Sequence, residues 1–212
     1  MEKLIASYAG KTVVGFGAHP DDLEIAMGGT IARLVEAGAR FIMVAVAVPG
    51  DLATRKVEAR AAAKVLGAEL EILEDERTSR VEDLAMHELV ARMDRVVREY
   101  QPEAIFAHTP QDVHHDHVLA HRAAITTMRL KPMDVFCYGP SSCRPTIFSW
   151  QPRVWVDVSA TIDRKVQSIS AHSTQFDDRG ICTQGFKDRA RSTGVALGIP
   201  YAEGFDVVCL RT

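Results

Sequence analysis

The stretch TVVGFGAHPDD, residues 12–22, joins an apolar run to a polar loop near the start of the chain. Its first six residues form a short, mostly apolar run that ends in glycine, a pattern that predicts a buried β-strand. One histidine and two aspartates follow this strand, as His19, Asp21 and Asp22. In open α/β sheets, ligands bind beyond the carboxyl ends of the strands. The stretch therefore predicts a parallel sheet with a functional site at the end of its first strand.

Short apolar runs alternate with helical patterns along the rest of the chain. Further strands are expected at residues 41–48, 69–73, 104–107, 135–138, 154–158 and 207–210, and helices at residues 24–38, 55–66, 84–100, 116–128, 162–172 and 185–197. This alternation predicts an α/β, Rossmann-like fold: a mostly parallel sheet with helices on both faces and the active site at the carboxyl ends of the strands. The length fits one domain, residues 1–212, with a surface loop at residues 139–152.

Composition excludes several classes of protein. The chain has 25 Lys plus Arg against 28 Asp plus Glu, a formal charge of −3, which argues against a nucleic-acid partner. It has no apolar run of about 18 residues, so no membrane span is expected. Its four cysteines are scattered, without a C-x-x-C pair, and the first residues do not resemble a signal peptide. These features predict a cytoplasmic protein with reduced thiols.

The loop after the first strand favours a metal site over a nucleotide site. Gly15 and Gly17 begin a dinucleotide fingerprint, but Pro20 occupies the third glycine position, where it removes a backbone donor and fixes φ. Zinc accepts histidine nitrogen and aspartate oxygen, and a catalytic zinc typically has three protein ligands. Asp21 or Asp22 could instead serve only to cap the next helix.

Histidines are concentrated in a second stretch. Of the eight in the chain, five lie close together: His108, His114, His115, His117 and His121. His117 and His121 are four residues apart and share one helix face. One histidine of this cluster is expected to complete a ligand set with His19 and Asp22. A carboxylate beside a ligating histidine commonly fixes its tautomer, a role open to Asp112 or Asp116.

The glycine pair and His172 each allow two interpretations, and His87 allows one. Gly28 and Gly29 within a helix indicate either close backbone packing near the site or a plain irregularity. His172 ends a helix, where it either contacts the last carbonyl groups or has a site role. His87 is expected on a solvated helix surface.

These motifs resemble those of the zinc-dependent PIG-L/LmbE-like N-deacetylases, along essentially the whole chain. The matching segments are AHPDD at residues 18–22, HHDH at 114–117 for the usual H-P-D-H, Arg55 with Glu58 and the AA…LG that follows, Lys165 with His172 and Gln175, and YAEGF at 201–205. The first two are specific, and the others are weak singly but occur in the right order. Two departures stand out: His115 replaces the usual proline, and the loop at residues 49–54 is shorter than in the family.

The resemblance implies a role for each matching residue. His19, Asp22 and His117 would bind one zinc ion per chain, with another divalent metal as the alternative. Asp21 would be the general base, and His114, held by Asp116, would stabilise the oxyanion and then protonate the leaving amine. Arg55 and His172 would contact the substrate.

The function that follows is removal of an N-acetyl group from a small molecule, an amino sugar such as N-acetylglucosamine or an amino-sugar conjugate. Relatives often assemble, which suggests a homo-oligomer. One alternative is a related zinc amidase acting on a larger acyl or thiol-conjugate amide. Another is a non-catalytic metal-binding module, which would have no need of Asp21.

Overall fold

The computed structural model describes residues 2–139 and 150–211. Its strands are β1 (Thr12–Gly17), β2 (Arg40–Ala45), β3 (Glu69–Ile72), β4 (Ala104–His108), β5 (Asp134–Tyr138), β6 (Val154–Asp157) and β7 (Ala202–Cys209). Within the described residues they form one seven-stranded sheet in the order β3-β2-β1-β4-β5-β7-β6. The strands from β3 to β5 pair in parallel, and β7 runs antiparallel to both of its neighbours.

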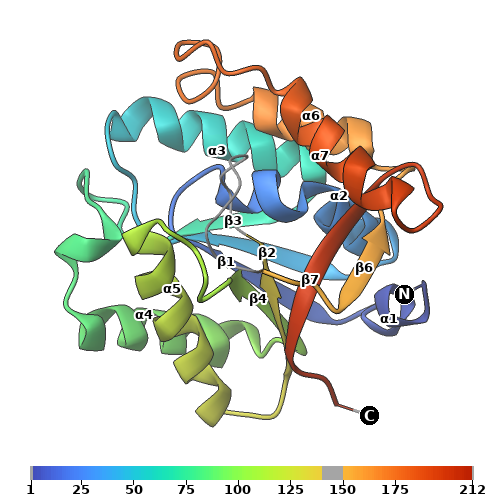
Figure 1. The fold of residues 1–212 in the computed structure, drawn as a ribbon. Helices are drawn as coiled ribbons and strands as arrows, with labels where there is room; N and C mark the ends of the chain where they lie inside the picture. Colours follow the sequence, from blue (N-terminus) through green and yellow to red (C-terminus); the bar gives the residue numbers. More distant parts are fainter. Residues whose placement is uncertain (1, 140–149, 212) are drawn as a thin grey trace.

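Helices cover both faces of this sheet (Figure 1). They are α1 (Glu2–Ser7), α2 (Asp22–Glu36), α3 (Leu52–Leu66), α4 (Met86–Tyr100), α5 (His115–Thr126), α6 (Ile162–Ser170) and α7 (Gln184–Val195), with short 3-10 turns at Val81–Asp83 and Thr127–Arg129. Helices α2, α3, α6 and α7 lie on one face, and α4 and α5 lie on the other (Figure 1). The predicted α/β, Rossmann-like fold with a mostly parallel sheet is confirmed.

The alternation of side chains along β1 shows how the sheet holds two separate cores. Val13 packs in the cluster formed with α2 and α3, whereas Val14 and Phe16 pack in the cluster formed with α4 and α5. All three side chains are fully buried. Successive residues of a strand point to opposite faces, so a strand covered on both sides is apolar throughout. This explains why the first strand lacks the polar alternation of a solvated sheet.

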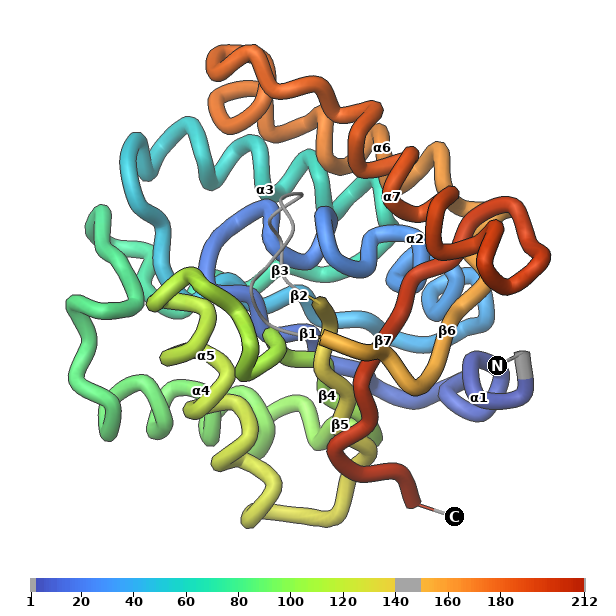
Figure 2. The backbone as a smooth tube through the Cα atoms, viewed as in Figure 1, coloured from blue at the N-terminus to red at the C-terminus, as the bar shows by residue number. Residues whose placement is uncertain are grey.

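The carboxyl ends of β1 and β4 define where a site can form. β1 pairs with β2 on one side and with β4 on the other, and both pairings are parallel. The chain leaves β1 through α2 on one face and reaches β4 through α4 on the other. The tube in Figure 2 shows this reversal of path at the centre of the sheet. Such a switch point leaves a crevice beyond the strand ends, where α/β proteins bind ligands.

Element boundaries differ from the predictions in a few places. β2 ends at Ala45, although residues 46–48 stay buried and the Val46 amide still bonds Gly17. β7 begins at Ala202, five residues before the predicted start. Helix α1 and the 3-10 turn Val81–Asp83 were not predicted. His87 is exposed as expected, and the loop predicted at residues 139–152 lies largely outside the described residues. In the described part of the chain, no helix has the length and apolarity to cross a bilayer.

Helix α2 bends beside the glycine pair, and the close-packing interpretation of that pair is confirmed. Met27 has non-helical backbone angles, φ −145° and ψ 21°. Gly29 also permits a close approach, because a Cβ there would lie 2.7 Å from Val158 Cβ.

We predict that Gly29→Ala destabilises the fold. The added methyl group would overlap Val158, and overpacking of this kind typically costs about 1–3 kcal/mol of unfolding free energy. Gly185→Ala is the matched control: it lies in the first turn of α7 with nothing within 4 Å, so it should be neutral or gain up to about 1 kcal/mol. Urea unfolding of the two variants measures both values, and equal stability of the two would contradict the close-packing explanation.

Candidate metal centre

The loop between β1 and α2 is closed by its own polar groups. The His19 amide donates to Asp22 Oδ2 at 2.8 Å. Asp21 stands at the N-cap position of α2 with φ 104°, a left-handed conformation that is rare outside glycine. Its side chain makes no capping hydrogen bond. Helix capping therefore does not explain Asp21, and the Asp22 carboxylate serves the loop and the site.

Asp22 lies between two imidazoles from different elements. Its Oδ1 is 3.3 Å from His117 Nε2, and its Oδ2 is 3.8 Å from His19 Nδ1. Ligand atoms around a tetrahedral zinc, each at about 2.1 Å from the ion, are about 3.4 Å apart. The two distances involve different oxygens of Asp22 and are close to that spacing, and the donor types suit a divalent metal such as zinc.

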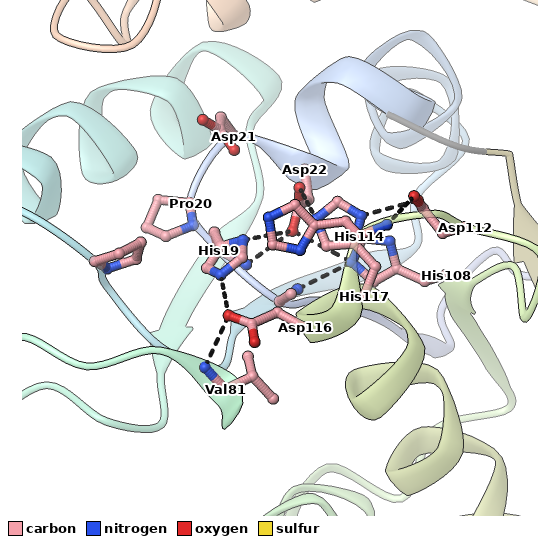
Figure 3. Close-up of polar contacts among 12 residues, drawn as sticks. His19, Pro20, Asp21, Asp22, Val81, His108, Asp112, His114, Asp116 and His117 are labelled. Atoms are coloured by element: carbon pink, nitrogen blue, oxygen red, sulfur yellow. Dashed lines mark hydrogen bonds and ion pairs between the residues drawn. The ribbon is translucent and has the colours of Figure 1, made fainter. Parts of the chain in front are cut away.

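More donor groups lie close to this set. The predicted ligands His19, Asp22 and His117 are divided between two overlapping groups, His19–His114–His117 and Asp22–His108–His117, each of which brings its donor atoms within 4.8 Å of one another. Figure 3 shows the imidazoles gathered around Asp22, with Asp112 and Asp116 at the edges of the group. The loop after β1 and the start of α5 meet here, where His19 and Asp116 are 97 residues apart in the chain.

Each of the two imidazoles beside Asp22 also binds a second carboxylate, through the ring nitrogen that points away from Asp22. His117 Nδ1 lies 2.9 Å from Asp112 Oδ2, and His19 Nε2 lies 2.8 Å from Asp116 Oδ2. Such carboxylates fix the tautomer and orientation of a ligating histidine. With the far nitrogens as donors, His117 Nε2 and His19 Nδ1 are the atoms turned toward Asp22. Of the two candidates left open by the sequence, both carboxylates take the role, one on each histidine.

The position of Asp116 corrects one expectation. The sequence prediction placed Asp116 beside His114, but its carboxylate binds His19 and also accepts the Val81 and Glu82 amides at 3.0 Å. Those two amides belong to the 3-10 turn that was not predicted, and nothing in its sequence indicates that it contacts α5. His114 is oriented differently: its ring stacks on His117 at 4.3 Å, and its amide donates to Asp112.

His108 joins the ends of β4 and β1. Its Nε2 accepts the Ala18 amide at 3.0 Å and lies 3.2 Å from Asp22 Oδ2. Burial and the neighbouring charge of His117 lower the pKa of His108 to about 4, so the ring is neutral. Because the Ala18 amide occupies the lone pair of Nε2, His108 is less suited to bind a metal than His19 or His117.

The remaining histidines of the cluster point elsewhere. His121 Nδ1 lies 2.6 Å from the His108 carbonyl oxygen and 3.8 Å from Cys137 Sγ. His115 is exposed and lines the cleft. His121 shares a helix face with His117, but these contacts direct its ring toward β4 and β5 rather than to Asp22.

The pKa of His117 shows how strongly this cluster attracts positive charge. Burial opposes protonation, but Asp22 and Asp112 outweigh it and raise the pKa of His117 to about 10 in the metal-free protein. A metal ion must displace this proton, so binding will release it.

Asp21 is held apart from the imidazoles (Figure 3). Arg55 donates to Asp21 Oδ2 at 3.2 Å, to Pro20 O at 2.8 Å and to Pro49 O at 3.1 Å. Burial and the charge of Asp22 raise the pKa of Asp21 to about 7, although Arg55 acts in the opposite direction. Arg55 lines the cleft but is only 4% exposed, so its contacts favour holding Asp21 over binding substrate.

His172 lies behind the cleft wall. It was expected to contact the substrate, but it is fully buried, and its Nε2 is 2.9 Å from Glu24 Oε1. The Glu24 carboxylate, two residues beyond Asp22 on α2, draws the ring inward, and His172 is not among the described residues that line the cleft. His172 is followed by a loop that α3 holds in place, because Glu58 of α3 accepts hydrogen bonds from Ser173 and Thr174. Figure 2 shows this loop above α3.

The cleft opens over the imidazoles. Its described lining combines charged side chains with apolar ones: Asp21, Arg55, Arg80, Glu82, Arg179, Ile25, Val113, Phe176, Ile181 and Phe186. A small molecule with polar and apolar parts fits such a lining.

A family model now gives an independent comparison. The model described as PIG-L, GlcNAc-PI de-N-acetylase, matches residues 14–128, more than half of the chain. The chain belongs to the PIG-L family. The matched segment runs from β1 to the 3-10 turn after α5 and contains all the donor residues described above.

Individual PIG-L relatives include more than one kind of enzyme. The uncharacterized deacetylase YaiS of Escherichia coli is 28% identical over 158 residues, 70% of this chain and 82% of that protein. The 4-oxalmesaconate hydratase of Pseudomonas putida is 26% identical over 242 residues, 95% of this chain and 90% of that protein. The crystal structure of N,N'-diacetylchitobiose deacetylase from Pyrococcus horikoshii, 23% identical, superposes with a TM-score of 0.75 over 93% of this chain and 84% of that one, which shows a shared fold.

We predict that Asp112→Asn weakens zinc binding by about 10–100-fold, the usual effect of losing a carboxylate behind a ligating histidine. Asp51→Asn is the control, because Asp51 also lines the cleft but binds only the start of α3, where asparagine caps equally well. Competition with a chelator measures both affinities. Unchanged zinc affinity in Asp112→Asn would show that Asp112 does not support His117.

Proposed function

We propose that this PIG-L protein is a metal-dependent hydrolase that removes the N-acetyl group from an amino sugar or an amino-sugar conjugate. The observation that carries the proposal is the arrangement of carboxylates. Asp112 and Asp116 each orient one imidazole beside Asp22, while a further carboxylate that lines the same cleft, Asp21, is held by Arg55 with a raised pKa. A metal-binding module needs Asp22, Asp112 and Asp116 but has no use for Asp21.

His19, Asp22 and His117 are the residues that would hold the metal. A divalent ion bound there supplies a Lewis acid that polarises a carbonyl group and makes a water molecule more acidic.

Asp21 is the residue we assign as general base. In the metal-free protein its pKa is about 7, near the value at which a base works best at neutral pH. Arg55 binds one of its oxygens, and the side chain makes no capping hydrogen bond to the helix that follows. Asp21 can therefore take the proton of a water molecule that attacks the amide carbon.

His114 is the residue we assign to the amide itself. Its ring is exposed to the cleft and stacks on His117, which sets its plane. From this position a protonated His114 can donate to the carbonyl oxygen as negative charge develops there, and then to the leaving nitrogen. General acid and general base steps typically contribute about 10²–10⁴-fold each.

The names of the relatives support the substrate class. YaiS is described as a deacetylase, and the family model carries the description of a GlcNAc-PI de-N-acetylase. An N-acetylated amino sugar is therefore the first substrate to test.

A second candidate function is hydration of a carbon–carbon double bond. The observation that favours it is the similarity to 4-oxalmesaconate hydratase over 95% of this chain. The same base could take a proton from water in either reaction. Acetate release from N-acetylglucosamine conjugates, measured beside consumption of 4-oxalmesaconate, separates the two functions, and a panel of bulkier amides tests the larger-acyl alternative.

Asp21→Asn should keep its bound metal and lose about 10²–10⁴-fold in kcat, because the amide side chain cannot accept the proton of water. Zinc content per chain and acetate release are measured on the same preparation. Glu82→Gln, which removes another carboxylate of the cleft, should stay near wild type. A fully active Asp21→Asn would refute the assignment of the base.

Removal of the metal should abolish activity, and reloading the metal should restore it. His117→Ala should lose both zinc and activity, because it removes one of the three ligands. His121→Ala serves as its control, since His121 sits on the same helix but binds the His108 carbonyl. Activity that survives a chelator, with no metal left in the protein, would exclude the proposed mechanism.

A further inference from the structure

The bend in α2 is held by two charged residues from other parts of the chain. In a regular helix, the carbonyl of Ile25 accepts from the amide of Gly29, four residues later. At this bend the Ile25 carbonyl accepts from Lys165 Nζ at 2.8 Å, and the Gly29 amide donates to Glu203 Oε1 at 3.1 Å. Glu203 Oε2 also accepts the Thr30 amide at 2.7 Å. Both members of one helical rung are thus bound by outside side chains.

Lys165 and Glu203 also bind each other. Lys165 Nζ donates to Glu203 Oε1, and the two residues are 3% and 4% exposed. Lys165 comes from α6 and Glu203 from β7, and Figure 1 shows α6 and β7 close to α2. Gly28 makes room for the lysine, since a Cβ there would lie 3.1 Å from Lys165 Cγ. Side chains inserted at a helical rung are a known cause of a kink.

The part of α2 before the bend is about one turn long and carries the residues nearest the metal centre. Asp22 lies between the two imidazoles, Glu24 binds His172, and Ile25 lines the cleft. So short a helix has little stability of its own, because helix formation needs several turns or tertiary support. Its far end is the Ile25 carbonyl, which Lys165 holds.

We propose that the Lys165–Glu203 ion pair positions Asp22 for metal binding, by fixing the angle at which the first turn of α2 leaves the rest of the helix. Lys165 and Glu203 are positioning residues, since they reach the metal centre only through α2. The inference rests on the metal site proposed above and not on the identity of the substrate.

The test is the zinc affinity of Lys165→Met, measured by chelator competition on the full chain. This change removes the donor to the Ile25 carbonyl and leaves Glu203 with its two amide donors. We expect zinc affinity to fall about 10–100-fold, the range seen when support of a ligand is lost. Lys165→Arg, which keeps the charge and the donors, should recover most of the affinity.

A control separates positioning from stability. Arg129 pairs with the buried Asp94 on α4, away from the metal centre. Arg129→Met should lower the melting temperature of the metal-free protein without changing zinc affinity. If Lys165→Met does not fold, Lys165→Met combined with Glu203→Gln removes both charges, a change buried pairs often tolerate. The same loss of zinc affinity is expected in that double variant.

Wild-type zinc affinity in a folded Lys165→Met or in the double variant would overturn the inference, as would an equal loss in Arg129→Met. A wild-type chain that binds zinc but releases no acetate would remove the proposed deacetylation and leave this inference supported by the titration. A wild-type chain that binds no zinc would overturn both.

Discussion

The parallel pairing of β1 with β4 is the constraint on which the metal centre depends. It brings the two polar loops to one edge of the sheet, and the hydrogen bond from the Ala18 amide to His108 joins the strand ends there. His108 must remain neutral to accept that bond, and its burial ensures this. This contact and the His19–Asp116 hydrogen bond together fix the distance between the loop bearing His19 and Asp22 and the start of α5.

Electrostatics in the centre are dominated by carboxylates. Although burial disfavours their charge, the adjacent imidazoles and amides hold the pKa of Asp116 at about 2 and that of Asp22 well below its usual range. Both are negative at neutral pH, and, against the effect of burial, the hydrogen bond to His117 also lowers the pKa of Asp112. Positive charge is correspondingly favoured between them, as a proton on His117 or as the metal ion proposed above. Burial and the charge of Asp22 together raise the pKa of Asp21 in the metal-free protein.

The sequence was sufficient for the fold class and for the neighbourhood of the site, but not for its contacts. Buried strands and residues such as His19 and Asp22 at their ends follow from local patterns. The partner of Asp116 could not be predicted, because it depends on how the turn at Val81–Asp83 packs against α5. β7 was placed too late, since Glu203 interrupts its apolar pattern, and this carboxylate is buried only because Lys165 accompanies it.

Support for α2 comes from two distant parts of the chain, and this limits how the protein can be divided. The segment that matches the family model, residues 14–128, contains every proposed metal ligand. The first turn of α2 nevertheless rests on Lys165 and Glu203, and Glu24 rests on His172. Residues 14–128 alone therefore lack the contacts that hold the first turn of α2. A fragment or chimera joined near residue 128 would inherit all the donor atoms of the centre without the side chains that aim them.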